Sequence, residues 1–288
     1  MSSFATVVVT LALASAAPSA EDLVKLGESL ANHGDGKGAI ARLDKALADP
    51  TITDAQKQRA QLSYGLALLQ LKKPKDAVPH LEQASALDSK SEKSWQLLGM
   101  AHDAAEQFPE AIAAYEKGVA ALPKSSTLKH ELGMAYLESG KNAEAAKVLV
   151  DAANLAPQDP EIRTDASYAL TVVGNFKDAK EQAAQAVSLA PESADALYNL
   201  GSAEAGLGNT KAAKDALKRA LDIDELHVPS LVQLGLVESA AGDDASASKR
   251  FMKVLQVEPD DARAKAGLGV SLAKLGSDDK KAQALLEE

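Results

Sequence analysis

The sequence predicts an all-α fold built from repeated pairs of antiparallel helices, and three observations support this prediction. A small residue returns every 34 residues from Gly65 to Gly269, and an alanine follows it twelve residues later in each repeat through Ala247. Glycines suited to a helix C-cap stand seven residues after most of these small residues. No long run alternates with the two-residue period of a β-strand. Each period therefore holds one helix, a tight turn and a second helix.

The composition of the 288 residues agrees with helices that pack through small side chains. Hydrophobic residues make up 46% of the chain but aromatic residues only 3%, and alanine is the best helix former because it loses no side-chain entropy. The formal net charge of −10 argues against nucleic acid as the main partner, since phosphate binding needs clustered Lys and Arg. Because the chain has no cysteine, it can form neither a disulfide nor a structural thiolate site.

The N-terminal stretch has the features of a secretory signal peptide. Residues 1–20 carry no charged side chain, and an apolar run over 4–14 leads into an A-x-A pattern with cleavage expected after Ala16. The run is too short to span a bilayer, so we expect no stable membrane span. No Lys or Arg follows Met1. We expect an exported protein, periplasmic or secreted; the alternative is a cytoplasmic protein in which this stretch is an apolar tail or docks on the helices.

The small residue of the first helix, here called the marker, can be followed through eight repeats. The first step is 38 residues rather than 34, and the excess falls in the turn-rich stretch 49–53, where extra loop residues cost little. The markers are Gly27, Gly65, Gly99, Gly133, Ser167, Gly201, Gly235 and Gly269. The small residues of the second helices are Ala39, Ala77, Ala111, Ala145, Ala179, Ala213 and Ala247. A small residue on each of two facing helices lets their backbones approach closely.

Helix ends are marked in the same register. The C-cap glycines, at which φ is expected to be positive, are Gly34, Gly140, Gly174, Gly208, Gly242 and Gly276. Thr53-x-x-Gln56 and Ser89-x-x-Glu92 fit the capping box, and Asp159 before a proline predicts an N-cap.

One repeat departs from the pattern at two places. Ser167 takes the marker position, and Ala183 stands where a large residue is usual.

The repeat that begins at Trp95 resembles the tetratricopeptide repeat. Its characteristic residues are Trp95-x2-Leu98-Gly99-x2-His102, Ala111-x3-Tyr115 and Pro123, and only His102 and Tyr115 differ from the 34-residue family signature. The resemblance implies a right-handed α-solenoid of antiparallel helix pairs. We expect it to span residues 21–288 with seven full repeats and a shortened, charged last one that caps the array. The expected repeats cover approximately residues 20–53, 58–91, 92–125, 126–159, 160–193, 194–227, 228–261 and 262–288.

The sequence gives no support for catalytic, metal or cofactor chemistry. The five histidines lie far apart without metal-ligand spacing, and no HExxH, phosphate-loop or G-x-S-x-G motif is present. The run Gly34-Asp35-Gly36-Lys37-Gly38 resembles a phosphate loop only superficially, because no strand precedes it. Paired carboxylates such as those at 243–244 precede or begin helices, where capping explains them. We expect no enzyme, no cofactor and no small-molecule substrate.

The resemblance also implies a concave groove lined by the first helices. In the family, partners contact the residue after the marker and residues three or four positions to either side, which share one helix face. The positions expected to line this groove are Leu62, Leu66, Gln96, Met100, His130, Met134, Tyr168, Tyr198 and Leu236. The Lys and Asn that form the carboxylate clamp of chaperone-binding members are absent from matching positions. We therefore expect a non-enzymatic scaffold that binds an apolar peptide or helix of a protein partner.

Two alternatives stay open. Tyr168, Tyr198 and the methionines could serve ordinary packing between repeats, because Met fills irregular gaps well and an apolar stripe usually belongs to a core. The chain could instead be a structural assembly factor of a cell-envelope complex, with its contacts at the solenoid ends or on the convex face.

Overall fold

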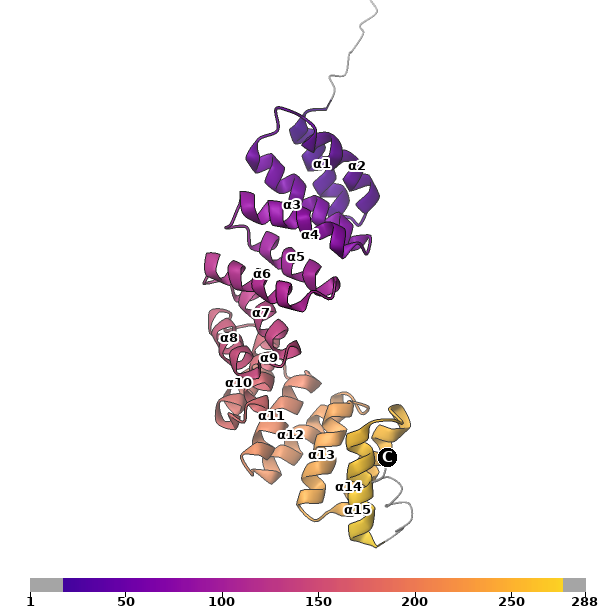
Figure 1. The fold of residues 1–288 in the computed structure, drawn as a ribbon. Coiled ribbons are helices and arrows are strands. Elements are labelled where there is room, and N and C mark those ends of the chain that lie inside the picture. Colours follow the sequence, from indigo (N-terminus) through magenta and orange to yellow (C-terminus); the bar gives the residue numbers. More distant parts are fainter. Residues whose placement is uncertain (1–17, 277–288) are drawn as a thin grey trace, which may run out of the picture. The chain divides into compact units, whose positions relative to one another are not determined.

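The computed structural model describes residues 18–276, and this part of the chain contains fifteen helices and no strand (Figure 1). The helices follow one another in pairs joined by short turns, which confirms the predicted all-α class. They are α1 (Ala20–Asn32), α2 (Gly36–Leu47), α3 (Asp54–Gln70), α4 (Pro74–Leu87), α5 (Glu92–Ala104), α6 (Phe108–Ala121), α7 (Ser126–Glu138), α8 (Asn142–Leu155), α9 (Pro160–Val172), α10 (Phe176–Leu189), α11 (Ala194–Gly206), α12 (Thr210–Ile223), α13 (Val228–Ala240), α14 (Asp244–Val257) and α15 (Ala262–Leu275). Over the described residues, no helix combines the length and the apolar character that crossing a membrane requires.

The chain divides into two compact units, residues 1–111 and residues 112–288, and the division falls inside α6. In the first unit α1 packs against α2 and α3 against α4, while the first helices of successive pairs, α1, α3 and α5, contact one another in turn. In the second unit the pairs are α7–α8, α9–α10, α11–α12 and α13–α14. There the first helices α7, α9, α11, α13 and α15 also contact one another in sequence, so that in each unit they form a continuous row.

Two expectations fall on residues outside the described part of the chain. These are the body of the signal peptide, over 1–17, and the charged second helix of the last repeat, over 279–288. At the start of the array, α1 begins at Ala20 with Ser19 as its N-cap, one residue before the expected start of the solenoid at residue 21. Ser19 caps α1 in a capping box with Asp22, and Ala20 is buried.

The marker glycines make room for a large side chain of the facing helix. A Cβ added at Gly27 would lie 2.5 Å from Leu43, and one at Gly133 would lie 2.5 Å from Leu149, whereas ordinary van der Waals contact begins at 3.4 Å. The same pairing recurs between Gly65 and Leu81, between Gly201 and Leu217, and between Gly235 and Phe251. Backbone proximity therefore explains only part of the pattern. Each glycine also accommodates the residue sixteen positions later in the chain.

In the pair α9–α10 the sizes of the two facing residues are exchanged. Its marker, Ser167, is fully buried and donates its hydroxyl to the backbone oxygen of Ala179 at 2.8 Å. The residue sixteen positions after it is Ala183, also fully buried. A larger side chain on the first helix is thus matched by a smaller one on the second. The two departures seen in the sequence are one compensating exchange.

Most predicted helix ends are confirmed, and one is wrong. Thr53 and Gln56 form the expected capping box at α3, and Asp159 accepts hydrogen bonds from two backbone amides at the start of α9. At α5 the N-cap is Ser91 rather than Ser89. Because Ser91 is the extended residue directly before the first helical one, its hydroxyl reaches the amide of Ser94.

The six predicted C-cap glycines all have positive φ. At the equivalent position of the α3–α4 and α5–α6 turns the chain instead places Lys72 (φ 57°) and Glu106 (φ 61°). Side chains with a Cβ adopt this left-handed conformation at a cost of about 1–2 kcal/mol.

Candidate partner-binding site

The residue after the marker is a large apolar side chain that stays exposed in several repeats. In the first unit Met100 is 42% exposed, and in the second unit Tyr168, Leu236 and Val270 are 44%, 46% and 42% exposed. Their neighbours in the chain are buried, as Ser167 and Ala169 are on either side of Tyr168. In the second unit α9, α13 and α15 carry such a side chain, whereas α11 has the buried Ser202 at this position. Apolar side chains that recur in the solvent at one repeat position have the character of an interaction surface rather than of a core.

The other expected groove residues are less exposed. Leu62, Leu66 and Gln96 of the first unit are half-buried, and Leu66 packs against the core formed by the first two helix pairs. In the second unit His130, Met134 and Tyr198 are also half-buried.

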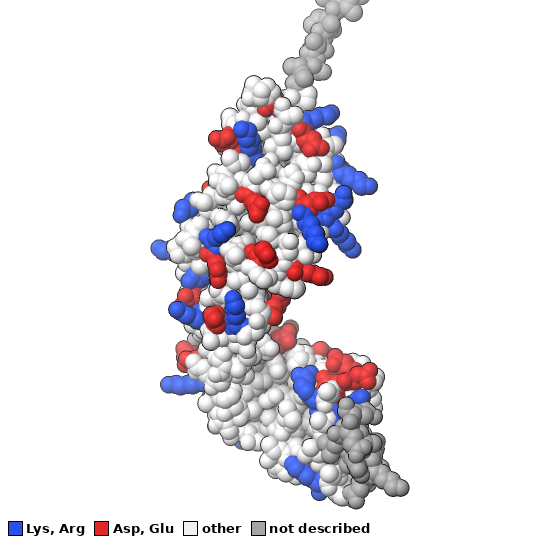
Figure 2. Space-filling model, in the orientation of Figure 1, with Lys and Arg blue, Asp and Glu red and all other residues white. Residues whose placement is uncertain are grey.

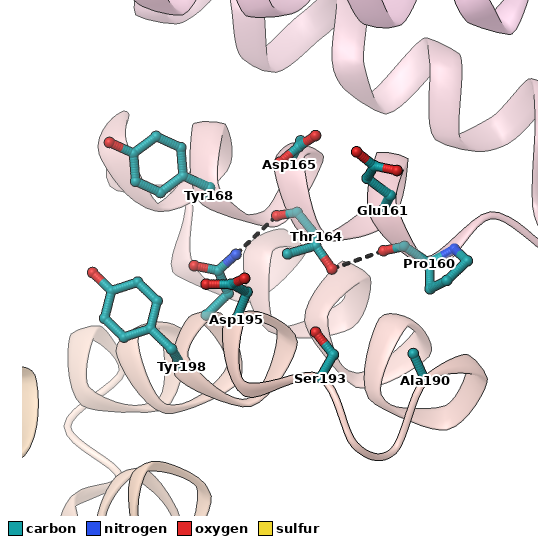
Figure 3. A pocket seen from close by; sticks show the side chains of 10 residues that line it. Pro160, Glu161, Thr164, Asp165, Tyr168, Ala190, Ser193, Asp195 and Tyr198 are labelled. Atoms are coloured by element: carbon teal, nitrogen blue, oxygen red, sulfur yellow. Dashed lines mark hydrogen bonds between the residues drawn. The ribbon is translucent and has the colours of Figure 1, made fainter. Parts of the chain in front are cut away.

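Tyr168 and Tyr198 are brought together at one cavity of about 520 Å³ in the second unit. Figure 3 shows the two rings extending from neighbouring helices on the same side of this cavity, with carboxylates beside them. The lining residues are Pro160, Glu161, Thr164, Asp165 and Tyr168 from α9, Ala190 and Ser193 from the α10–α11 connection, and Asp195, Tyr198 and Asn199 from α11. The volume lies within the range of ligand pockets, about 300–1,000 Å³.

Hydrogen bonds within and between the helices hold the wall of the cavity. Thr164 donates its hydroxyl to the backbone oxygen of Pro160 at 2.7 Å, and the amide of Asn199 on α11 donates to the backbone oxygen of Thr164 on α9 at 2.9 Å. Ser193 caps α11 by accepting from the amide of Ala196 at 3.2 Å. These hydrogen bonds fix the N-terminal parts of α9 and α11, from which most of the lining residues come.

Two histidines contact the carboxylates from the neighbouring helices. His130 on α7 lies 2.6 Å from Asp165, and this hydrogen bond raises the pKa of the imidazole although partial burial opposes the rise. His227, the residue directly before α13, lies 3.0 Å from Asp195. Its ring also meets the ring of Tyr198 edge to face, with centroids 5.9 Å apart. The cavity itself is lined by residues of α9, α11 and the connection before α11, and the two histidines contact its carboxylates from outside this lining.

The charged residues of the cavity were not expected from the sequence. Glu161, Asp165 and Asp195 were not among the expected groove positions, yet a local signal for two of them exists. Asp165 stands three residues before Tyr168, and Asp195 stands three residues before Tyr198. Residues three apart share a helix face, so a repeated Asp-x-x-Tyr pattern indicates an acidic and aromatic surface.

Charged side chains are distributed differently over the two units in the face that Figure 2 shows. Over the first unit, basic and acidic side chains are interspersed. Over α10–α12 of the second unit few charged side chains are in view. Within the described residues, no three His, Asp or Glu side chains are placed to hold a metal ion.

Comparison with known proteins identifies the family. Models described as tetratricopeptide repeat match residues 24–92, 102–164 and 165–227, which together make up most of the chain. No curated protein sequence matches significantly.

Solved structures are similar over long stretches. The crystal structure of YrrB, described as a TPR protein with an unusual peptide-binding site, shares 26% identity over 60% of this chain and 89% of that one, with a TM-score of 0.54. The C-terminal part of a TPR repeat-containing protein from Cytophaga hutchinsonii shares 16% identity over 85% of this chain and 99% of that one, with a TM-score of 0.63. PilW, described as a type IV pilus biogenesis factor, shares 20% identity over 67% of this chain and 90% of that one, with a TM-score of 0.60. The latter two show the fold alone. With its periodic markers, its helix pairs and these family matches, the chain belongs to the tetratricopeptide repeat family.

Proposed function

We propose that this chain is a scaffold that captures an apolar peptide or helix of a protein partner on the row of first helices in its second unit. The tetratricopeptide fold supports a protein–protein interaction scaffold, and proteins of this family are generally not enzymes. The observation that favours this site is the exposure of Tyr168 and Leu236 at the same repeat position, directly after the buried marker.

Physical chemistry and one relative support the proposal. Exposed apolar side chains at the same position of several first helices match a helix-in-groove or extended-peptide mode of recognition. Aromatic and Met side chains are enriched in such interfaces, because they bury a large area on contact. YrrB, which is similar over 60% of the chain, is described as having a peptide-binding site.

The test is affinity capture with charge introduced on this face. Protein bearing Tyr168→Glu and Leu236→Glu is compared with wild type as bait, and captured proteins are identified by mass spectrometry. The two carboxylates would have to be desolvated against an apolar partner, so we expect capture to fall at least about tenfold while helicity stays unchanged.

A matched control uses exposed apolar residues of the second helices. Leu189 and Ile223 end α10 and α12 and are similarly exposed. Leu189→Glu with Ile223→Glu should leave capture at the wild-type level. Equal capture by wild type and by the Tyr168/Leu236 variant would contradict the proposal.

The control variant also tests a second candidate, an assembly factor of a cell-envelope complex that uses the second-helix side. The specific observation in its favour is that the last residue of several second helices is also an exposed apolar side chain. These residues are Leu87, Leu155, Leu189, Ile223 and Val257. Loss of capture in the Leu189/Ile223 variant alone would favour this candidate.

Export is part of the same proposal and has its own test. The uncharged stretch over 1–20, with its apolar run over 4–14, supports cleavage after Ala16 during secretion to the periplasm or medium. N-terminal sequencing of protein recovered from its host should then begin at Ala17. A mature chain that begins at Met1 or Ser2 would contradict export and favour the cytoplasm.

A further inference from the structure

We propose that the cavity between α9 and α11 receives the cationic side chain of a Lys or Arg residue in the partner segment. This inference rests on the proposed function, because it specifies the chemistry of the segment that the same face captures. It follows from the charges, the aromatic rings and the volume of the cavity.

The carboxylates of the cavity exceed the positive charge around them. Glu161, Asp165 and Asp195 line it, and the lining includes no Lys or Arg. Arg163, on the same helix, is directed elsewhere: it donates to the backbone oxygen of Pro157 at 3.0 Å and to Gln182 at 2.8 Å. Each carboxylate is therefore left without a Lys or Arg partner among the lining residues.

The positive ends of the helix dipoles offset only part of this negative charge. Glu161 and Asp195 lie in the first turns of α9 and α11, where a carboxylate interacts favourably with the helix dipole. Each helix N-terminus carries only about half a positive charge, so two termini offset about one of the three carboxylates. Asp165 lies beyond the first turn and receives little of this stabilisation.

The histidines leave the cavity acidic when they are neutral. His130 and His227 then donate an N–H to Asp165 and Asp195 without removing the charge of the carboxylates. The pKa of His130 is raised, with its hydrogen bond to Asp165 the largest cause and the charges of Glu131 and Glu161 adding to it. Arg263 on α15 interacts electrostatically with Tyr198, but its guanidinium is paired with Asp261 at 2.9 Å.

The aromatic rings of the two tyrosines distinguish this cavity from an ordinary solvated acidic surface. Figure 3 shows the two rings on the same side of the cavity with Asp195 near them, and Tyr168 is 44% exposed. A Lys ammonium or Arg guanidinium is attracted to an aromatic face, and the attraction grows when water is excluded. The aliphatic stem of either side chain would lie against the rings while its charged end reaches the carboxylates. A cavity of about 520 Å³ has room for such a side chain and for water.

The test selects peptides on the full chain at about pH 8, above the ordinary range of histidine titration. A phage-displayed library of random peptides is panned on wild type and on Glu161→Gln/Asp195→Asn, which removes two charges without changing volume. We expect Lys or Arg at one fixed position of peptides selected on wild type, and no such enrichment on the variant. The matched control is Glu181→Gln/Asp215→Asn, which removes the same charge from the exposed surface of α10 and α12.

Binding of a selected peptide then gives a quantitative check. Its affinity should fall about tenfold on the Glu161/Asp195 variant and on Tyr168→Leu, and should stay unchanged on the control. Replacing the basic residue of the peptide by norleucine should abolish the difference between wild type and variant. Selected peptides without a fixed basic residue would overturn this inference and leave the proposed function standing. A library that yields no binder, or binders unaffected by Tyr168→Glu/Leu236→Glu, would overturn the proposed function and the inference together.

Discussion

The exchange of sizes between Ser167 and Ala183 predicts a specific coupling between these two positions. Four other pairs place glycine opposite leucine, and a Cβ at those glycines would lie within 2.6 Å of the leucine side chain. Ser167 carries such a Cβ already. Ala183→Leu should therefore overfill the α9–α10 interface, and Ser167→Gly should relieve the overlap.

The expected magnitudes follow from the contacts. Overpacking by Ala183→Leu should cost about 1–3 kcal/mol. Ser167→Gly loses the 2.8 Å hydrogen bond to Ala179, worth about 1 kcal/mol, and places glycine inside a helix at a further cost of about 0.5–1 kcal/mol. The double variant regains the glycine–leucine pairing of the other repeats. It should recover at least about 1.5 kcal/mol relative to the sum of the single changes.

The assay is local hydrogen exchange combined with urea unfolding. A repeat array need not unfold in a single step, so the free energy of opening is read from the amides of α9 and α10 rather than from one global transition. The reciprocal cycle is the control. Gly133→Ser and Leu149→Ala should each destabilise α7–α8, and together they should recreate the serine–alanine pairing and recover part of the loss.

Additive effects would refute this reasoning. If the double variant Ser167→Gly/Ala183→Leu lies within about 0.5 kcal/mol of the sum of the two single variants, the residues do not compensate each other. Serine and alanine would then occupy these positions independently.

Three further predictions follow from individual contacts. Lys72→Gly should raise the free energy of unfolding by about 0.5–1 kcal/mol, because glycine adopts the positive φ of this position without the steric cost of a Cβ. The melting temperature measures this change, and no gain would show that the turn is unstrained. Because the pKa of His130 is raised in the fold, its pairing with Asp165 stabilises the protein fully below the unfolded pKa, and this stabilisation is lost as pH rises through the folded pKa. NMR titration should place its midpoint above that of a model histidine peptide, and Asp165→Asn should lower it; an unchanged midpoint would contradict the pairing. Arg59, by hydrogen bonding, lowers the pKa of Glu21 to about 2 from 4.5, so this link between α1 and α3 stabilises α1 above pH 4.5 and weakens as pH falls toward about 2. Arg59→Met should speed amide exchange in α1 near neutral pH and remove the dependence of this exchange on acid. Exchange rates in the variant equal to those of wild type would show that the link is unimportant.

The helix pairs could be predicted because their determinants are local and periodic. A glycine marker, a C-cap glycine and an N-cap side chain each act within a few residues, and the 34-residue spacing repeats them in one register. At α5 the local signals are ambiguous. Ser89 and Ser91 both precede the helix, and only the backbone conformation decides which hydroxyl reaches an amide.

The cavity could be predicted only in part, because it does not follow the period of the repeat. Tyr168 and Tyr198 are thirty residues apart, so they occupy different positions of the 34-residue repeat, and a comparison of equivalent positions does not bring them together. The structure nevertheless places both at one cavity, since neighbouring first helices are in contact. The partners of its carboxylates, His130 and His227, come from two further helices and carry no spacing signal.

The most direct test of the account is photocrosslinking from defined positions. Benzoylphenylalanine is introduced at Tyr168 or Leu236 on the first helices, or at Leu189 or Ile223 on the second helices, and the protein is irradiated in its host. Crosslinks to one partner from Tyr168 and Leu236, with none from Leu189 and Ile223, are the predicted result. Crosslinks from the second-helix positions alone would contradict partner capture by the row of first helices.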